Sequence, residues 1–423
     1  MAEKLLFSTE AYDSIFDGPR PNGSCALWMI PEYGKPTIPH TLGEWNFFDE
    51  DGKMFDKDML RVQAFPDNFN HLKVEYKYPH EIEGRKHLYL INVQNTNYFV
   101  QNKHLGFRYI SKQYIDDVKN GQAKIVINFD NEGTSGTDHY DDFAIVESWR
   151  KRANLPEYSV IFVTGNHLSS QIAADKNLKI KTVPHSDFET WNIQYTQDKV
   201  IEFKPEDSEY LFLGYNRMLR RSRALLLASY IKNGLWEKGK ISVEEYLYKK
   251  GDFYGVEEKW YAELGKLSPR KISDDLYYNL ASSVNIEDHE KTFVSVITET
   301  LTSSDTLFLS EKTWKPIQLG HPFMTLGNPG TLALLQQRGY KTFSDFWDES
   351  YDTLGTDIER AEVICNNLKK LSKLTKEELI ALRIEIKPIL EHNLNIFKQE
   401  LKDNFYKGGA LKKLEKILRK LIE

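Results

Sequence analysis

Short apolar runs alternate with amphipathic stretches along the first half of the chain. The runs at residues 124–130 (KIVINFD) and 158–165 (YSVIFVTG) predict strands, and helix-like patterns at 109–119 and 142–153 stand beside them. β-branched and aromatic residues predict a further strand at 89–99 (YLINVQNTNYF). Strands that alternate with helices are typical of βαβ units, so the pattern predicts a parallel sheet.

The same alternation restarts after a charged stretch at residues 203–209. Buried-type runs predict strands at 210–215 (YLFLGY), 293–298 (FVSVIT) and 321–327 (HPFMTLG), and helical patterns follow at 222–233, 311–319 and 330–337. The run at 241–248 begins another strand or a helix. From residue 358 onward, leucines at three- and four-residue spacing with Lys and Glu between them predict helices to the end of the sequence.

These patterns divide the chain into two α/β units and a helical tail. A chain of 423 residues is too long for one ordinary hydrophobic core. The predicted domains are residues 1–205, residues 206–375 and a helical tail at 376–423. The fold class is therefore α/β.

Composition narrows the class of protein only slightly. The net charge of −6 excludes a generally basic surface, although a local basic cleft is enough to bind nucleic acid. The two cysteines, Cys25 and Cys365, match no metal-ligand spacing. The sequence shows no signal-like start and no apolar run of about 18 residues, so we expect a cytoplasmic protein without membrane partners.

An arginine-rich junction follows the strand predicted at 210–215. The stretch GYNRMLRRSR sets five polar residues at the opening of a helix, namely Asn216, Arg217, Arg220, Arg221 and Arg223. A helix N-terminus offers free N–H groups, and arginine binds phosphate oxygens with two hydrogen bonds. The junction indicates an anion site; the alternative is a solvated basic face or a set of internal salt bridges.

A second junction, FLSEKTWKPIQLGHPF at residues 308–323, places a charged pair at a helix start. Ser310 is a good N-cap, and the helix dipole stabilises Glu311 in the first turn. Glu311 can accept hydrogen bonds from two vicinal hydroxyls such as those of a ribose, and Lys312 can meet a phosphate. Pro316 predicts a short helix. The alternative is a capping pair followed by an ordinary kink.

The third junction is INFDNEGTSGTDHYDD at residues 127–142. Asp130 and Glu132 follow a strand directly and can act as a general base toward a hydroxyl nucleophile. They can equally cap the next helix. The acidic cluster at 345–352 favours helix capping over a metal site. The sequence contains no GxSxG, Walker loop, GxGxxG or HExxH motif.

Two of these stretches resemble glycosyltransferases. ITET at 297–300 and SEKTWKPIQLGHPFMTLGNPGTLALLQQRGYKTF at 310–343 resemble a C-terminal block of phage and viral glycosyltransferase-like proteins, and more distantly the donor domain of α1,3-fucosyltransferases. In that block a glutamate closes one strand, Thr-Glu-Lys begins a helix, and a proline-containing strand follows. Glu299, Glu311–Lys312 and Pro322 stand in this order, with Ser310 in place of the usual threonine. YNRMLRRSR resembles the arginine-bearing start of the same domain, so the resemblance covers residues 210–352.

The resemblance implies a GT-B-like architecture, in which two facing Rossmann-like domains bind a nucleotide sugar between them. Residues 1–205 would form the acceptor side and 206–375 the donor domain. The implied activity is transfer of a sugar from a nucleotide-diphosphate sugar, such as a UDP-sugar, to a hydroxyl acceptor by direct, inverting displacement. No cofactor or metal is expected, because arginines can neutralise the leaving diphosphate.

The resemblance also implies roles for the candidate residues. Arg217, one of Arg220 and Arg221, and Lys312 would neutralise the diphosphate, with Asn216 and Ser310 beside them. Glu311 would hold the ribose, and Glu299 would orient Lys312 or the sugar. Glu132 or Asp130 would deprotonate the acceptor.

Several acceptors fit the sequence. A hydroxylated or hydroxymethylated pyrimidine in phage DNA, modified in the host cytoplasm, is slightly favoured over a cell-surface glycan. The basic tail at 403–423 and Trp149 with residues 150–152 are the candidate DNA contacts; a solvated helix face is the alternative for both. A catalytically silent GT-B scaffold that binds a nucleotide or glycan, and a structural protein whose tail recruits a partner, are the other readings. The sugar, the nucleotide base and the oligomeric state stay open.

Overall fold

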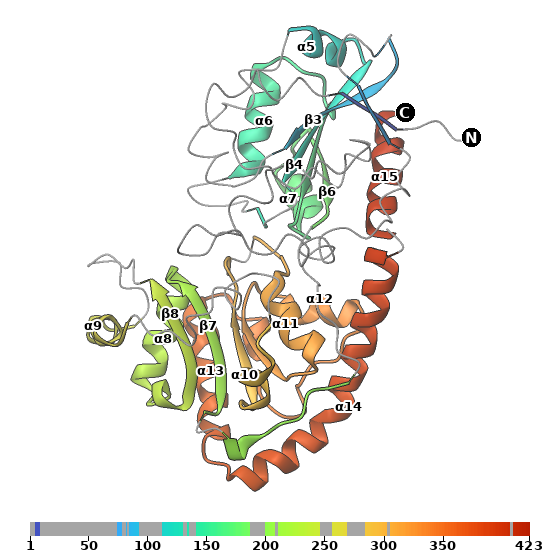
Figure 1. Ribbon diagram of the computed structural model, residues 1–423. Helices are drawn as coiled ribbons and strands as arrows, with labels where there is room; N and C mark the ends of the chain where they lie inside the picture. Colours follow the sequence, from blue (N-terminus) through green and yellow to red (C-terminus); the bar gives the residue numbers. More distant parts are fainter. Residues whose placement is uncertain are drawn as a thin grey trace, which may run out of the picture. The chain divides into compact units, whose positions relative to one another are not determined.

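The chain folds into two compact units that are each built on a parallel sheet (Figure 1). The computed structural model describes residues 5–8, 74–77, 82, 84–92, 112–129, 133–134, 141–186, 199–207, 210–245, 256–268, 284–302, 305–406 and 409–423. Unit 1 comprises Met1–Trp191 together with Leu401–Glu423, and unit 2 comprises Asn192–Glu400.

Unit 1 contains a parallel sheet of order β2-β1-β3-β4-β5-β6. Its strands are β1 (Leu5–Ser8), β2 (Val74–Lys77), β3 (His87–Asn92), β4 (Ala123–Phe129), β5 (Val160–Thr164) and β6 (Lys181–Pro184). Its helices are α5 (Lys112–Lys119), α6 (Asp142–Arg152), α7 (Ser169–Asp175) and α15 (Gly409–Ile422), with a π-helix at Leu401–Tyr406. β4 and β5 are almost continuously apolar because parallel strands are covered on both faces.

Unit 2 contains a four-stranded parallel sheet of order β10-β9-β7-β8. The strands are β7 (Phe212–Met218), β8 (Gly239–Glu245), β9 (Val294–Thr298) and β10 (Phe323–Leu326). The α-helices are α8 (Arg221–Lys232), α9 (Glu258–Leu267), α10 (Ile286–Glu290), α11 (Glu311–Leu319), α12 (Thr331–Gln337), α13 (Asp357–Leu371) and α14 (Lys376–Glu400). Short 3₁₀ helices lie at Pro205–Asp207, Trp236–Lys238 and Ser350–Asp352.

The predicted α/β class is confirmed, and the apolar runs at 124–130, 158–165, 210–215, 293–298 and 321–327 each overlap a strand. The ambiguous run at 241–248 contains the end of β8. β6 and α7 have no counterpart among the predicted elements. The contacts separate the two units between residues 191 and 192, and the predicted domain bounds at 205 and 375 stay predictions.

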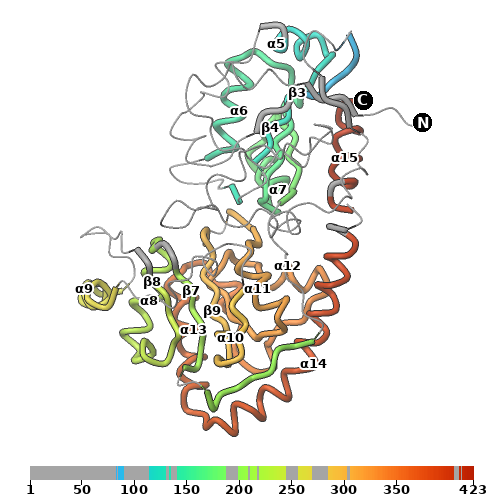
Figure 2. Tube along the Cα trace, viewed as in Figure 1, coloured from blue at the N-terminus to red at the C-terminus, as the bar shows by residue number. Residues whose placement is uncertain are grey.

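The predicted helical tail is split between the units. α14 packs against α11 in unit 2, as the tubes of Figure 2 show. α15 belongs to unit 1, where Leu414 and Leu418 are buried. Lys86 Nζ donates to the carbonyl of Glu423 at 2.9 Å, and Lys124 Nζ donates to that of Leu421. The tail is therefore a structural part of both units.

Two of the candidate DNA contacts are buried. The Trp149 ring lies in the core of unit 1 and is 7% exposed. Arg150 pairs with Glu147 at 2.7 Å and donates to the carbonyl of Leu155 at 2.7 Å. The prediction that these two side chains contact DNA is wrong, because α6 turns them into the protein. Lys151 and Arg152 are exposed.

α11 joins the sheet of unit 2 to α14 through one large aromatic side chain. Trp314 is 1% exposed, and its ring lies 5.9 Å from that of Tyr340 and 6.2 Å from that of Phe397 in α14. The guanidinium of Arg338 lies 4.7 Å from the centre of the same indole. Packing of the buried Trp314 indole therefore holds α11 against α14 and so helps to set the position of the helix's first turn.

Gly320 ends α11 in a left-handed conformation with φ +61°. Its N–H donates to the carbonyl of Ile317, and the next N–H, from His321, donates to that of Pro316. A Cβ at position 320 would lie 2.7 Å from Cγ2 and 3.0 Å from Cα of Val200. Both the backbone angle and the close approach therefore require glycine. The helix is nine residues long, which confirms the short helix predicted from Pro316.

None of the helices in the described part of the chain is long and apolar enough to cross a membrane.

We predict that Gly320→Ala destabilises unit 2. The left-handed backbone alone costs an alanine about 1–2 kcal/mol, and the contact with Val200 adds to it. In calorimetry we expect a Tm lower by about 2–8 °C. Gly355→Ala is the control because a Cβ there meets nothing within 4 Å; its Tm should stay within about 2 °C of wild type. Equal shifts in the two variants would contradict this role for Gly320.

Candidate donor site in unit 2

The candidate site lies where the strand order of unit 2 reverses. The chain passes from β7 to β8 on one side, then returns to β9 and β10 on the other side of β7. α8 follows β7 and α11 follows β9, so both helices begin at the carboxyl edge of the sheet on either side of this reversal. In open α/β sheets such a switch point is where ligands bind.

A buried carboxylate holds α11 to the end of β9. Glu299 directly follows β9 and is 1% exposed. Ser310 Oγ donates to Glu299 Oε2 at 2.6 Å, and Thr313 Oγ1 donates to Glu299 Oε1 at 2.9 Å. Each carboxylate oxygen thus has a hydroxyl donor, which offsets the cost of burying the charge. These bonds fix the first turn of α11 against the sheet.

Ser310 is also the N-cap that the sequence predicts. Its Oγ accepts a hydrogen bond from the backbone N–H of Lys312 at 3.2 Å while it donates to Glu299. Its backbone is extended, as an N-cap requires. One hydroxyl therefore both starts the helix and ties it to Glu299.

Three charged side chains follow on one face of α11. Lys312 Nζ lies 2.7 Å from Glu311 Oε1, and the two side chains are 24% and 12% exposed. Lys315 stands one turn beyond Glu311. Burial alone would raise the pKa of Glu311, but Lys312 and then Lys315 lower it below its usual value. Glu311 is therefore an ionised acceptor in the first turn of the helix.

Lys315 has a displaced pKa of its own. Burial lowers the pKa of its ammonium group to about 8; the Glu311 carboxylate opposes this shift and Lys312 adds to it. A bound anion would favour the charged form of Lys315.

Arg223 brings the start of α8 into the same cluster. It is the third residue of the helix and only 6% exposed. Burial lowers the pKa of its guanidinium and Arg220 adds to this effect, whereas Glu299 and Glu311 act in the opposite direction. The electrostatic coupling connects two junctions that lie almost ninety residues apart in the sequence.

Buried polar atoms without hydrogen-bond partners lie near the carboxyl ends of three neighbouring strands. They are Asn216 Oδ1 in β7, Thr298 Oγ1 in β9 and Thr325 Oγ1 in β10, and none bonds to another described residue. A Cβ on Gly327 would lie 3.1 Å from Thr325 Oγ1 and 3.4 Å from Glu299 Cγ. Native proteins rarely leave such atoms unsatisfied, so this edge of the sheet is suited to a polar ligand.

The structure brings together part of the predicted donor-binding set. Glu299, Ser310, Glu311 and Lys312 form one bonded network, and Arg220 and Arg221 are exposed at the start of α8. Asn216 is buried, and its Nδ2 donates to the carbonyl of Gly214 at 3.3 Å. Arg217 lies in β7, and nothing is described of its side chain.

The predicted catalytic bases, Asp130 and Glu132, lie outside the described residues. Both stay predictions.

Sequence reasoning missed Thr313 and Lys315 and left Arg223 out of the donor-binding set. Helical spacing would have found the first two, since Thr313 is three residues beyond Ser310 and Lys315 four beyond Glu311. The direction of the Arg223 side chain depends on the packing of α8, which no local pattern shows.

The acidic cluster at 345–352 is partly explained. Asp352 accepts from the backbone N–H groups of Leu332 and Ala333 at 2.8 and 3.1 Å, so it caps α12 as expected. Among the described residues, no group of three or more His, Cys, Asp or Glu side chains is placed to hold a metal ion.

No family model matches the chain, and no curated protein matches it. Solved structures that match include a DNA-modifying β-glucosyltransferase studied with uridine diphosphoglucose, at 11% identity over 83% of this chain and 89% of that one, with a TM-score of 0.37. Anabaena HepE in complex with UDP matches at 9% identity over 99% and 100%, with a TM-score of 0.38. An α1,3-fucosyltransferase matches at 11% identity over 82% and 86%, with a TM-score of 0.31. Likenesses with scores this low carry no argument about function.

We predict that the pKa of Lys315 responds in opposite directions to its two neighbours. Glu311→Gln removes a negative charge and should lower this pKa from about 8, whereas Lys312→Gln removes a positive charge and should raise it. Competitive labelling with acetic anhydride, read by mass spectrometry across pH, measures the value. Glu377→Gln, an exposed change on α14, should leave it unchanged. Shifts of the same sign in both variants would contradict the geometry.

Proposed function

We propose that the protein is a glycosyltransferase that binds a nucleoside-diphosphate sugar at the start of α11 and transfers the sugar to a hydroxyl acceptor. The observation that carries the proposal is the cluster at the switch point of unit 2. There an ionised carboxylate, Glu311, stands among Lys312, Lys315 and Arg223 at the N-termini of two helices.

The ribose and the diphosphate of such a donor each have a counterpart in the cluster. The Glu311 carboxylate can accept hydrogen bonds from both hydroxyls of a ribose, as a carboxylate has two oxygens. Lys312, Lys315 and the exposed Arg220 or Arg221 can bind the diphosphate, and the positive ends of the two helix dipoles favour the same anion. We assign Arg217 to this group as well, from the sequence resemblance.

The same cations supply the catalytic effect. Negative charge builds up on the diphosphate as the bond to the sugar breaks, and preorganised cations stabilise that charge. Arg223 is the most deeply buried of them, so its field is the least screened by water. We therefore expect transfer to proceed in the presence of EDTA.

Glu299 acts as a positioning residue in this scheme. Both of its oxygens accept from hydroxyl groups of α11, so it sets the place of Glu311 and Lys312.

The acceptor half of the proposal rests on the sequence resemblance. Glu132 or Asp130 would deprotonate the acceptor hydroxyl in an inverting displacement. A hydroxylated or hydroxymethylated pyrimidine in DNA is the first acceptor to test, and a glycan hydroxyl is the second.

The donor can be identified by calorimetry and thermal shift with UDP-, GDP- and ADP-glucose, with and without EDTA. A donor at 100 times its Kd should stabilise the native state by about 2.7 kcal/mol. Release of the nucleoside diphosphate that depends on an added hydroxymethylated DNA or glycan then tests transfer. Absence of binding across this panel would contradict the proposal.

We predict that Lys312→Ala weakens binding of the donor by about tenfold, because a partly buried cation beside the diphosphate is lost. The fold should persist, since the Lys312 side chain bonds to no described residue outside Ser310 and Glu311, which lie on its own turn of the helix. Lys376→Ala removes an exposed lysine of α14 and is the matched control. Isothermal titration measures both. Equal affinities in the two variants would remove Lys312 from the donor site.

A further inference from the structure

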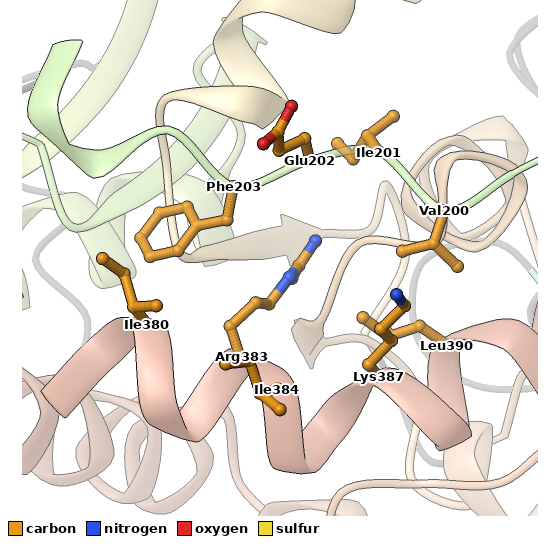
Figure 3. A pocket seen from close by; sticks show the side chains of 9 residues that line it. All are labelled: Val200, Ile201, Glu202, Phe203, Ile380, Arg383, Ile384, Lys387 and Leu390. Carbon is orange, nitrogen blue, oxygen red and sulfur yellow. The ribbon is translucent and has the colours of Figure 1, made fainter. Parts of the chain in front are cut away.

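A cavity lies within unit 2, at the opposite edge of the sheet from the candidate donor site. Its volume is about 420 Å³, which falls in the range of roughly 300–1,000 Å³ typical of small-molecule sites. It lies between α14 and the segment at residues 200–203 that precedes β7 (Figure 3). The nearby strand ends are the amino ends of β9 and β10, so the cavity is separate from the cluster at the carboxyl edge.

A buried arginine from α14 reaches into this cavity. Arg383 is 7% exposed, and its side chain extends from the helix toward the segment at 200–203 (Figure 3). Nη2 donates to the carbonyl of Gly320 at 3.1 Å, and Nη1 lies at a long 3.4 Å from that of Phe293. Both partners are neutral backbone carbonyls.

The charge of Arg383 is buried and has no counter-ion among the residues that the structure describes. No carboxylate forms an ion pair with it in the part of the chain that the structure describes, and burial alone lowers the pKa of its guanidinium to about 9. The neighbouring His289 and His321 have pKa values lowered by burial, so neither is charged at neutral pH. A buried charge without a counter-ion is unfavourable, and an entering anion would relieve that cost.

The residues that line the cavity favour an anion that also has an apolar part. Phe203, Ile380, Ile384 and Leu390 supply apolar surface. Ile380 and Ile384 are 40% and 65% exposed, which leaves apolar area for a ligand to cover. Lys387 and Glu202 also line the cavity, but both are exposed and Lys387 lies 3.8 Å from Glu391, so the buried charge that a ligand must neutralise is the single one of Arg383. A dianion such as phosphate would exceed that balance and leave the apolar wall uncovered.

We propose that this cavity binds an amphipathic organic monocarboxylate, with its carboxylate on the Arg383 guanidinium and its hydrocarbon body against Phe203 and the isoleucines of α14. The guanidinium is planar and presents a pair of N–H groups that match the two oxygens of a carboxylate. The site does not depend on the proposed glycosyltransferase activity, because its residues are distinct from those of the donor cluster.

The test compares octanoate with 1-octanol and inorganic phosphate on the full-length protein, by isothermal titration and ligand-observed NMR. We expect saturable one-to-one binding of octanoate, at least about tenfold weaker binding of octanol because it lacks the charge, and no binding of phosphate. Octanol that binds as tightly as octanoate would overturn the proposal, and so would phosphate that competes with octanoate.

Two surface variants test the charge balance without disturbing the fold. Lys387→Gln should weaken octanoate by about two- to fivefold, and Glu202→Gln should tighten it by a similar factor, because both groups are exposed. Lys376→Gln makes the same charge change elsewhere on α14 and should have no effect. Arg383→Gln, if it folds, should weaken octanoate by about thirtyfold or more. Unchanged affinity in both the Lys387 and Glu202 variants would overturn the proposal.

Discussion

The candidate site depends on one buried carboxylate, that of Glu299, which is placed by the last hydrogen bonds of a sheet. Its backbone N–H donates to the carbonyl of Leu326 at 3.0 Å, so the residue extends the pairing of β9 with β10 by one position. A carboxylate at 1% exposure is costly unless its oxygens are hydrogen-bonded. Ser310 and Thr313 supply those bonds, and as a consequence the first turn of α11 can take one position only. The charged groups of the site stand on that turn.

The charged groups of the candidate donor site carry a net positive charge, which favours binding of an anion. Two carboxylates, Glu299 and Glu311, face three cations, Arg223, Lys312 and Lys315. The helix N-termini repel positive charge, so three cations near them would be unfavourable alone. Attraction between the two carboxylates and the three cations offsets this repulsion. One positive charge is left over, and the positive ends of the two helix dipoles add to it. α11 also links this edge of the sheet to the other one, because its last turn ends at Gly320, whose carbonyl accepts from Arg383.

Much of the fold follows from local pattern, and much of the site does not. Runs such as VIFV in β5 and the cap Ser310 with Gly320 at the far end of α11 are decided within a few residues, so the sequence predicts them. β6 was missed because only one of its four residues, Val183, is buried, so the strand forms no apolar run. The place of residues 201 and 204 in unit 2 depends on long-range bonds, because the N–H of Ile201 donates to the carbonyl of Leu319 and the N–H of Lys204 to that of Glu290. The inward direction of Arg223 and the return of α15 to unit 1 likewise depend on long-range packing.

Amide hydrogen exchange with and without saturating UDP-glucose locates the donor, because a ligand at the starts of α8 and α11 slows the exchange of the backbone N–H groups there. We expect slower exchange in peptides that cover residues 310–315 and 221–224, with residues 380–390 of α14 unaffected. Protection confined to other segments, or none when calorimetry shows the donor bound, would contradict a donor site at the start of α11.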